Sequence, residues 1–102
     1  MPSTHKQVFR TGRGFTAAHF RCAKVPVPEP ANGEVRIRVE AVGLELETGG
    51  SWPPWRDSTP GGQVVGTVDR IGPSTKSDLF GQRVAAWLPR GAWAEHACAA
   101  EP

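Results

Sequence analysis

Apolar and polar residues alternate most regularly along the segment Glu34–Val42. Successive side chains of an extended chain point to opposite sides, so one side of this segment carries Val35, Ile37 and Val39. The opposite side carries only charged residues, namely Glu34, Arg36, Arg38 and Glu40. This period of two predicts a strand with its aliphatic side chains in a core and its charged side chains in water.

Shorter segments of similar character precede and follow this strand: Gln7–Arg10, Phe20–Val25, Val64–Ile71, Gly81–Leu88 and Ala92–Ala99. The 102 residues include 12 Gly and 10 Pro, which indicates many turns. Pro26, Pro28 and Pro30 lack backbone donors, so this stretch is extended and at most an edge. No strand is followed by a long amphipathic helix. We therefore predict one all-β domain over residues 1–102, a small barrel or sandwich of short, mostly antiparallel strands.

The alternation breaks between Gly43 and Gly62. The first residues after Gly43 could form a turn of helix, but the glycines and prolines that follow cannot continue it. A connection of this length in a compact domain is either disordered or functional. Trp52 and Trp55 favour a functional loop at about 43–62, because disordered segments contain few aromatic residues.

The composition excludes several classes of function. The net charge is +2 without a basic run, which argues against binding to nucleic acid. No stretch approaches the roughly 20 apolar residues of a membrane span, and the N-terminus lacks the apolar core of a signal peptide. Cys22 and Cys98 lie far apart in the sequence, which predicts two free, partly buried thiols. We expect a cytoplasmic protein.

Four motifs in order resemble one known family. The first is Val-Pro-Val-Pro-Glu-Pro at 25–30, leading into the strand 34–39 and Ala-Val-Gly-Leu at 41–44. Pro60-Gly61 with Gly66, Val68 and Gly72 is the second, Gly-Gln-Arg-Val-Ala at 81–85 the third, and Gly-Ala-Trp-Ala-Glu at 91–95 the fourth. Together they resemble the GroES-like N-terminal domain of the medium-chain dehydrogenase/reductase family, of the zinc-independent quinone oxidoreductase type. The co-chaperonin subunit shares this fold, but Thr11 to Phe20 does not resemble its mobile loop.

The resemblance also shows where this chain departs from zinc-dependent relatives. Their catalytic cysteine corresponds to Glu45, and their Gly-His-Glu corresponds to Gly61-Gly62-Gln63. The four cysteines of the family's structural zinc lobe are absent, and His5, His19 and His96 have no ligand spacing. Zinc requires three or four such ligands within tetrahedral reach. We therefore expect no metal.

A nucleotide-binding Rossmann domain follows the barrel in this family, with a glycine-rich turn that holds the cofactor's pyrophosphate at a helix N-terminus. The 102 residues contain no such strand–turn–helix pattern. We therefore expect no cofactor-binding residue in this chain, and NADPH only if a Rossmann domain is supplied.

In the relatives, the segment that matches 43–62 lines the substrate cleft. The resemblance therefore implies that substrate contacts come from five residues, namely Leu44, Glu47, Trp52, Trp55 and Arg56. Glu45 and Gln63 are the catalytic candidates, Glu45 as a proton-transfer group if desolvated by tryptophan and Gln63 as a hydrogen-bond donor to a carbonyl. Alternatively, Glu45 is a solvated loop carboxylate, the Gln63 amide bonds only to backbone groups of the loop, and the two loop tryptophans cap the barrel end. Trp87 and Trp93 lie in strands, and we expect them to pack in the core.

Three functional readings follow. The favoured one is a stand-alone, reductase-derived domain that binds a small apolar or conjugated carbonyl or enone compound. It would catalyse a redox-neutral cyclisation or isomerisation in secondary metabolism. The alternative is the substrate-binding half of a zinc-independent, NADPH-dependent quinone oxidoreductase or enoyl reductase, with its Rossmann domain missing or on another chain. The third is a non-catalytic module for protein interaction. Bare strand edges also make a homodimer or a partner domain plausible.

Overall fold

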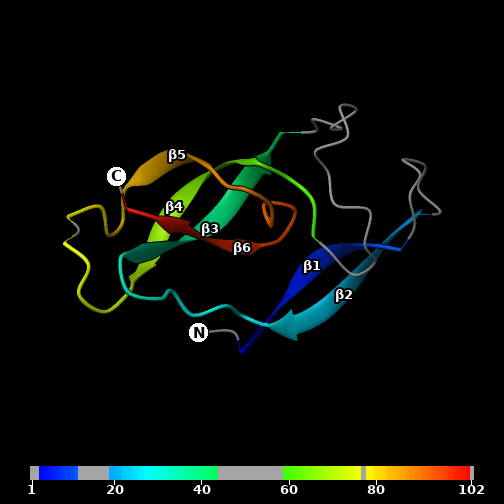
Figure 1. The fold of residues 1–102 in the computed structure, drawn as a ribbon, viewed down its shortest axis with the longest axis horizontal. Coiled ribbons are helices and arrows are strands. Elements are labelled where there is room, and N and C mark those ends of the chain that lie inside the picture. Colours follow the sequence, from blue (N-terminus) through cyan, green and yellow to red (C-terminus); the bar gives the residue numbers. More distant parts are fainter. Residues whose placement is uncertain (1–2, 12–18, 44–58, 77, 102) are drawn as a thin grey trace.

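A computed structural model describes residues 3–11, 19–43, 59–76 and 78–101. It contains six strands: β1 (Thr4–Arg10), β2 (Phe20–Pro26), β3 (Glu34–Val42), β4 (Gln63–Ile71), β5 (Arg83–Trp87) and β6 (His96–Ala100). β1 and β2 form a two-stranded sheet, and the other strands form a larger sheet in the order β5–β4–β3–β6, with every pair antiparallel (Figure 1). The all-β prediction is confirmed, and no α-helix occurs among the described residues.

The predicted strands are all present, and their boundaries differ only at the ends. β3 has the predicted limits, whereas β1 begins three residues before the predicted Gln7. The last predicted strand is shorter, because β6 begins at His96 and residues 92–94 are not part of the larger sheet. There they run beside β1 instead, with one bridge between Gln7 and Ala94.

The core lies on one face of the larger sheet. Ile37 and Val68 are fully buried at its centre, with Val35, Val64, Ala92 and Ala99 around them. Val39, the third residue of the predicted inner face, is half-buried and packs against this cluster. The two-residue period of β3 therefore identified the core side of the strand correctly.

The opposite side of β3 is not uniformly exposed, which corrects the prediction for Arg36. Arg38 and Glu40 are exposed as expected, but Arg36 is only 2% exposed. The chain that follows β2 passes over it, and the Pro28 carbonyl oxygen accepts a hydrogen bond from its guanidinium at 3.2 Å. Alternation of side chains cannot reveal such a cover, because the covering segment has no regular structure of its own.

The small sheet is joined to the larger one through the residues before β6. The Val8 N–H donates to the Trp93 carbonyl at 2.9 Å, and the Glu95 N–H donates to the Lys6 carbonyl at 3.0 Å. The Lys6 N–H in turn donates to the Glu95 carboxylate at 2.6 Å. These bonds place the β1–β2 pair beside one end of the larger sheet (Figure 1).

Replacement of Ile37 provides a measure of how much stability this core supplies. We expect Ile37→Ala to lower the free energy of unfolding by about 2–5 kcal/mol, because the side chain is fully buried and its removal leaves a cavity. Ile37→Val removes one methylene and should cost about 0.5–1.5 kcal/mol. Urea unfolding followed by circular dichroism measures both. Equal losses for the two variants would contradict a tightly packed site at Ile37.

Candidate functional site

A hollow lies on the face of the larger sheet opposite the core, where β3, β4 and β5 end nearest Gly43. We call it the outer groove; it is lined by residues 41–43, 63–65 and 85–87 and has a volume of about 260 Å³. Gln63 is paired across the strands with Trp87, and Val65 is paired with both Ala41 and Ala85. The side chains on this face thus form two rows across the strands. One row ends at Trp87 and the other at Ala85, both on β5.

A β-bulge in β3 produces the apolar floor of the outer groove. Glu40 is an extra residue between the pairs Val39–Gly66 and Ala41–Val65. A bulge of one residue reverses the faces of the residues that follow it. Val42 consequently packs against the core, and the small side chain of Ala41 lies in the outer groove. Small residues here leave the space that larger side chains would fill.

Polar side chains border the floor on the side away from Gly43. The Thr67 hydroxyl donates to one Glu40 carboxylate oxygen at 3.0 Å, and Arg83 Nε lies 3.1 Å from the other. Exposed ion pairs of this kind contribute little stability. They affect the position of Glu40, since they bind both of its carboxylate oxygens and hold the charge beside the floor of the outer groove.

Gly43 and Trp93 hold Gln63 in the outer groove. The Gly43 N–H donates to the Gln63 carbonyl at 3.2 Å, while the Gly43 carbonyl accepts a bond from the Trp93 indole N–H at 3.0 Å. A Cβ atom on Gly43 would lie 2.8 Å from Gln63 Oε1, so glycine leaves room for the Gln63 side chain. The backbone of Gln63 is therefore fixed beside Gly43, and its side chain occupies the space that glycine leaves at the end of the outer groove.

The structure locates only part of the predicted site. Gln63 lies in the outer groove, as stated above. The other predicted site residues, Leu44, Glu45, Glu47, Trp52, Trp55 and Arg56, lie outside the described residues. The role of Gln63 as a hydrogen-bond donor to a carbonyl remains a prediction, as do the roles of the others.

The expectation that two strand tryptophans pack in the core is confirmed for one of them and wrong for the other. Trp93 is half-buried and packs against the core, as expected for it. Trp87 is 75% exposed, so the expectation of core packing is wrong for this residue. β5 is an edge strand, and the side chains that alternate with Val84 and Ala86 point away from the core. The sequence could not distinguish the two faces of so short a strand.

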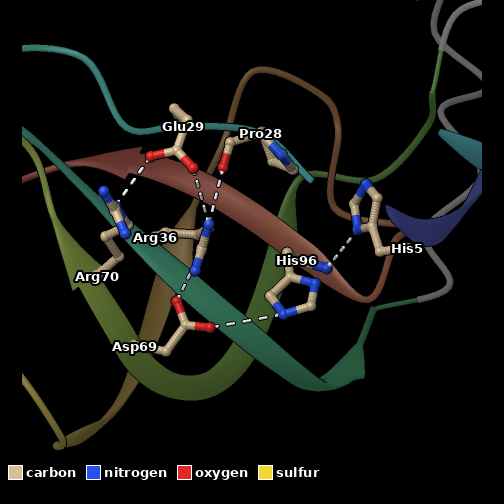
Figure 2. Close-up of polar contacts among 7 residues, drawn as sticks. All are labelled: His5, Pro28, Glu29, Arg36, Asp69, Arg70 and His96. Carbon is tan, nitrogen blue, oxygen red and sulfur yellow. Dashed lines mark hydrogen bonds and ion pairs between the residues drawn. The ribbon is translucent and has the colours of Figure 1, made fainter. Parts of the chain in front are cut away.

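A polar cluster, buried at Arg36 and His96, lies outside the outer groove (Figure 2). Arg36 forms an ion pair with Asp69 at 2.8 Å and approaches Glu29 at 3.6 Å. Asp69 also lies 3.5 Å from His96 Nε2, and Glu29 pairs with Arg70 at 2.9 Å. The cluster joins β3, β4, β6 and the segment after β2.

His5 extends this cluster to the small sheet. Its Nδ1 accepts a hydrogen bond from the His96 backbone N–H at 3.1 Å, so its proton resides on Nε2, which donates to the Gln7 side chain at 3.1 Å. Gln7 in turn donates to the Thr59 hydroxyl at 2.6 Å. The two imidazole rings lie 5.3 Å apart although 91 residues separate them in sequence. No spacing motif in the sequence could have revealed this pair.

Neither the outer groove nor the polar cluster forms a metal site. Within the described ranges, no three His, Cys, Asp or Glu side chains converge as metal ligands. Both cysteines are free; Cys22 is exposed rather than partly buried, and burial raises the pKa of the Cys98 thiol to about 11. A nicotinamide cofactor does not fit the described part of the chain, because no α-helix there presents an N-terminus to a pyrophosphate. None of its segments is a helix long and apolar enough to cross a membrane.

The polar cluster predicts a pH dependence of stability. Burial lowers the pKa of His96 below its ordinary 6.5, and His5 and Arg36 act in the same direction, while Asp69 and Glu95 oppose them. Because the unfolded chain takes up this proton first, the free energy of unfolding is fully retained above pH 6.5. It falls as the pH drops from 6.5 toward the folded pKa, by at most about 1.4 kcal/mol per pH unit.

We expect His96→Gln to remove this contribution to the slope. Urea unfolding at a series of pH values on both sides of 6.5 measures the slope for the variant and for the wild-type chain. A His96→Gln variant with an unchanged slope would show that His96 is not the group that titrates.

Comparison with known proteins agrees with the fold and with the order of the motifs. No protein-family profile matches the chain. It is 36% identical over 85 residues to the synaptic vesicle membrane protein VAT-1 homolog-like of Mus musculus, covering 78% of this chain and 20% of that protein. It is 36% identical over 101 residues to a chloroplastic quinone-oxidoreductase of Triphysaria versicolor, covering 88% of this chain and 31% of that protein. The chain thus spans less than a third of each of these relatives.

Solved structures give the same result. The human VAT-1 homolog-like protein superposes with a TM-score of 0.85 at 31% identity, over 97% of this chain and 33% of that one. A mycobacterial protein solved in complex with NADPH superposes with a TM-score of 0.74 at 29% identity, over 96% of this chain and 30% of that one. The chain therefore belongs to the medium-chain dehydrogenase/reductase family, and its residues correspond to the GroES-like N-terminal domain of that family.

Proposed function

We propose that this domain is the substrate-binding half of a zinc-independent, NADPH-dependent quinone oxidoreductase. The observation that carries the proposal is the outer groove, an apolar hollow with one side-chain amide, that of Gln63, at its end. A relative of this chain bears the name quinone-oxidoreductase, and another was solved with NADPH. NADPH binds to the Rossmann domain in this family, and the 102 residues do not include that domain.

The chemistry of the outer groove suits a neutral carbonyl compound. Among the described residues that line it, none has an acidic or basic side chain, so an apolar ring would lose little by leaving water for its floor. The Gln63 side-chain N–H would donate to a carbonyl oxygen of the quinone. The same bond would stabilise the negative charge that grows on this oxygen when the ring is reduced.

Gln63 corresponds, by the family resemblance, to the glutamate beside the metal in zinc-dependent relatives. A neutral amide in this place supplies hydrogen bonding where those relatives support a cation. The relatives favour this reading over a redox-neutral cyclisation or isomerisation through Glu45, for which no relative provides support. A homodimer, through the open edges of the larger sheet, and a cytoplasmic location remain part of the proposal.

The proposal predicts quinone binding by the 102-residue chain alone. In ¹⁵N NMR titrations, 2,3-dimethyl-1,4-naphthoquinone should shift the amide signals of residues 41–43, 63–65 and 85–87, and NADPH should shift none of them. Both reactive ring positions of this quinone are blocked, so the exposed Cys22 thiol cannot add to it. Shifts with NADPH but not with the quinone would contradict the proposal.

Gln63→Ala should weaken quinone binding about 2- to 12-fold, the loss expected for one hydrogen bond of about 0.5–1.5 kcal/mol. Gln82→Ala is the matched control, because Gln82 is exposed, bonds to the Asp78 carbonyl and does not line the outer groove. Equal affinities of the two variants would exclude Gln63 from the binding site.

A further inference from the structure

Trp87 is exposed to a degree that the packing of the domain does not explain. Its side chain is 75% exposed at the end of β5, and Phe80, at 63%, is the other exposed large apolar residue in the described part of the chain. Burying an indole removes about 150–250 Å² of surface from water, and that stabilisation is forgone here. An exposed tryptophan on an edge strand also favours association with other molecules. Its position is therefore better explained by binding than by stability.

Trp87 and Phe80 differ in what lies beside them. Trp87 lines the outer groove and is paired across the strands with Gln63, whose side chain lies on the same face. Directly opposed residues in an antiparallel pair have Cβ atoms about 4.5–5.5 Å apart. Phe80 precedes β5 and does not line the outer groove. Of the two, only Trp87 combines an exposed ring with a hollow and a polar group.

The floor beside Trp87 is shaped for a flat molecule. Ala41, Val65 and Ala85 form the neighbouring row across the three strands, and their side chains are much shorter than the indole. The indole thus forms a wall beside a low apolar surface. A volume of about 260 Å³ lies just below the usual range for ligand pockets, which limits the occupant to one or two rings.

The charges around the outer groove select for a neutral occupant. Arg83 and Glu40 stand beyond the floor and are paired with each other at 3.1 Å, so neither offers a free charge to a ligand. An anionic or cationic ligand would lose its hydration without gaining a charged partner among the lining residues that the structure describes. A planar neutral ring with a carbonyl group loses little hydration free energy when it binds.

We propose that Trp87 is a substrate-binding residue, whose indole stacks against the ring of a neutral planar quinone while Gln63 donates to its carbonyl oxygen. This inference rests on the proposed function and assigns the ring specificity of the same site. Trp87 selects for conjugated, flat rings over saturated ones, because stacking between π-systems requires a planar partner.

Two ligands and three variants test this role. The probes are 2,3-dimethyl-1,4-naphthoquinone and cyclohexane-1,4-dione, which keeps two carbonyl groups without a conjugated ring. Trp87→Leu should weaken binding of the quinone about 2- to 12-fold, the value of one aromatic contact, and leave binding of the dione within twofold. Trp87→Phe keeps a smaller ring and should recover part of the affinity. Phe80→Leu is the matched control, which removes an equally exposed ring outside the outer groove and should leave both affinities unchanged.

The outcomes separate this inference from the proposed function. Equal quinone affinities for Trp87→Leu and Phe80→Leu, with a loss in Gln63→Ala, would overturn the role of Trp87 and leave the proposed function standing. Equal losses for both probes in Trp87→Leu would overturn the ring specificity. A wild-type chain that binds neither probe would overturn the proposed function and this inference with it. Dispersed ¹⁵N spectra of each variant establish that it is folded before its affinity is compared.

Discussion

The pairing of β3 with β4 is interrupted by two bulges, and most other features of the domain depend on them. Asp69 is the extra residue on β4, between the pairs Arg36–Arg70 and Ile37–Val68, and Glu40 is the extra residue on β3. A bulge redirects the side chains around it and increases the local twist. Both extra residues are acidic, and each pairs with an arginine of another strand: Asp69 with Arg36 of the adjacent β3, and Glu40 with Arg83 of β5, on the far side of β4.

The bulge at Asp69 organises the polar cluster around Arg36. It brings a carboxylate to the guanidinium of Arg36, a charge that would be costly to bury without a partner. The same carboxylate lies beside His96, whose backbone N–H is bonded by His5 of the small sheet. The redirected carboxylate and the small sheet thereby contact the same residue, His96, and the sheets are held together by polar contacts as well as by the backbone bonds of β1.

The bulge at Glu40 organises the exposed side. It turns Val42 toward the core and Ala41 toward the outer groove. The odd-numbered residues of β3 therefore face the core before the bulge, and an even-numbered residue faces it after the bulge. Trp93, which packs on the core, then bonds to Gly43 beside the outer groove. Core and outer groove are the two faces of one sheet, and a change in the position of β3 would alter both.

The sequence by itself determined the strands, the core face of β3 and the family, because a two-residue period and ordered glycine and proline motifs are local properties of the chain. It also singled out Gln63, through the family motif in which it lies. Only the tertiary structure showed that Arg36 is buried, that His5 meets His96 and that Trp87 is exposed. The first depends on an irregular segment that covers β3, and the second on a contact between residues 91 positions apart in sequence. The third depends on the position of β5 at the edge of the sheet. None of them leaves a local pattern, since the energy of each contact depends on residues that are neighbours only after folding.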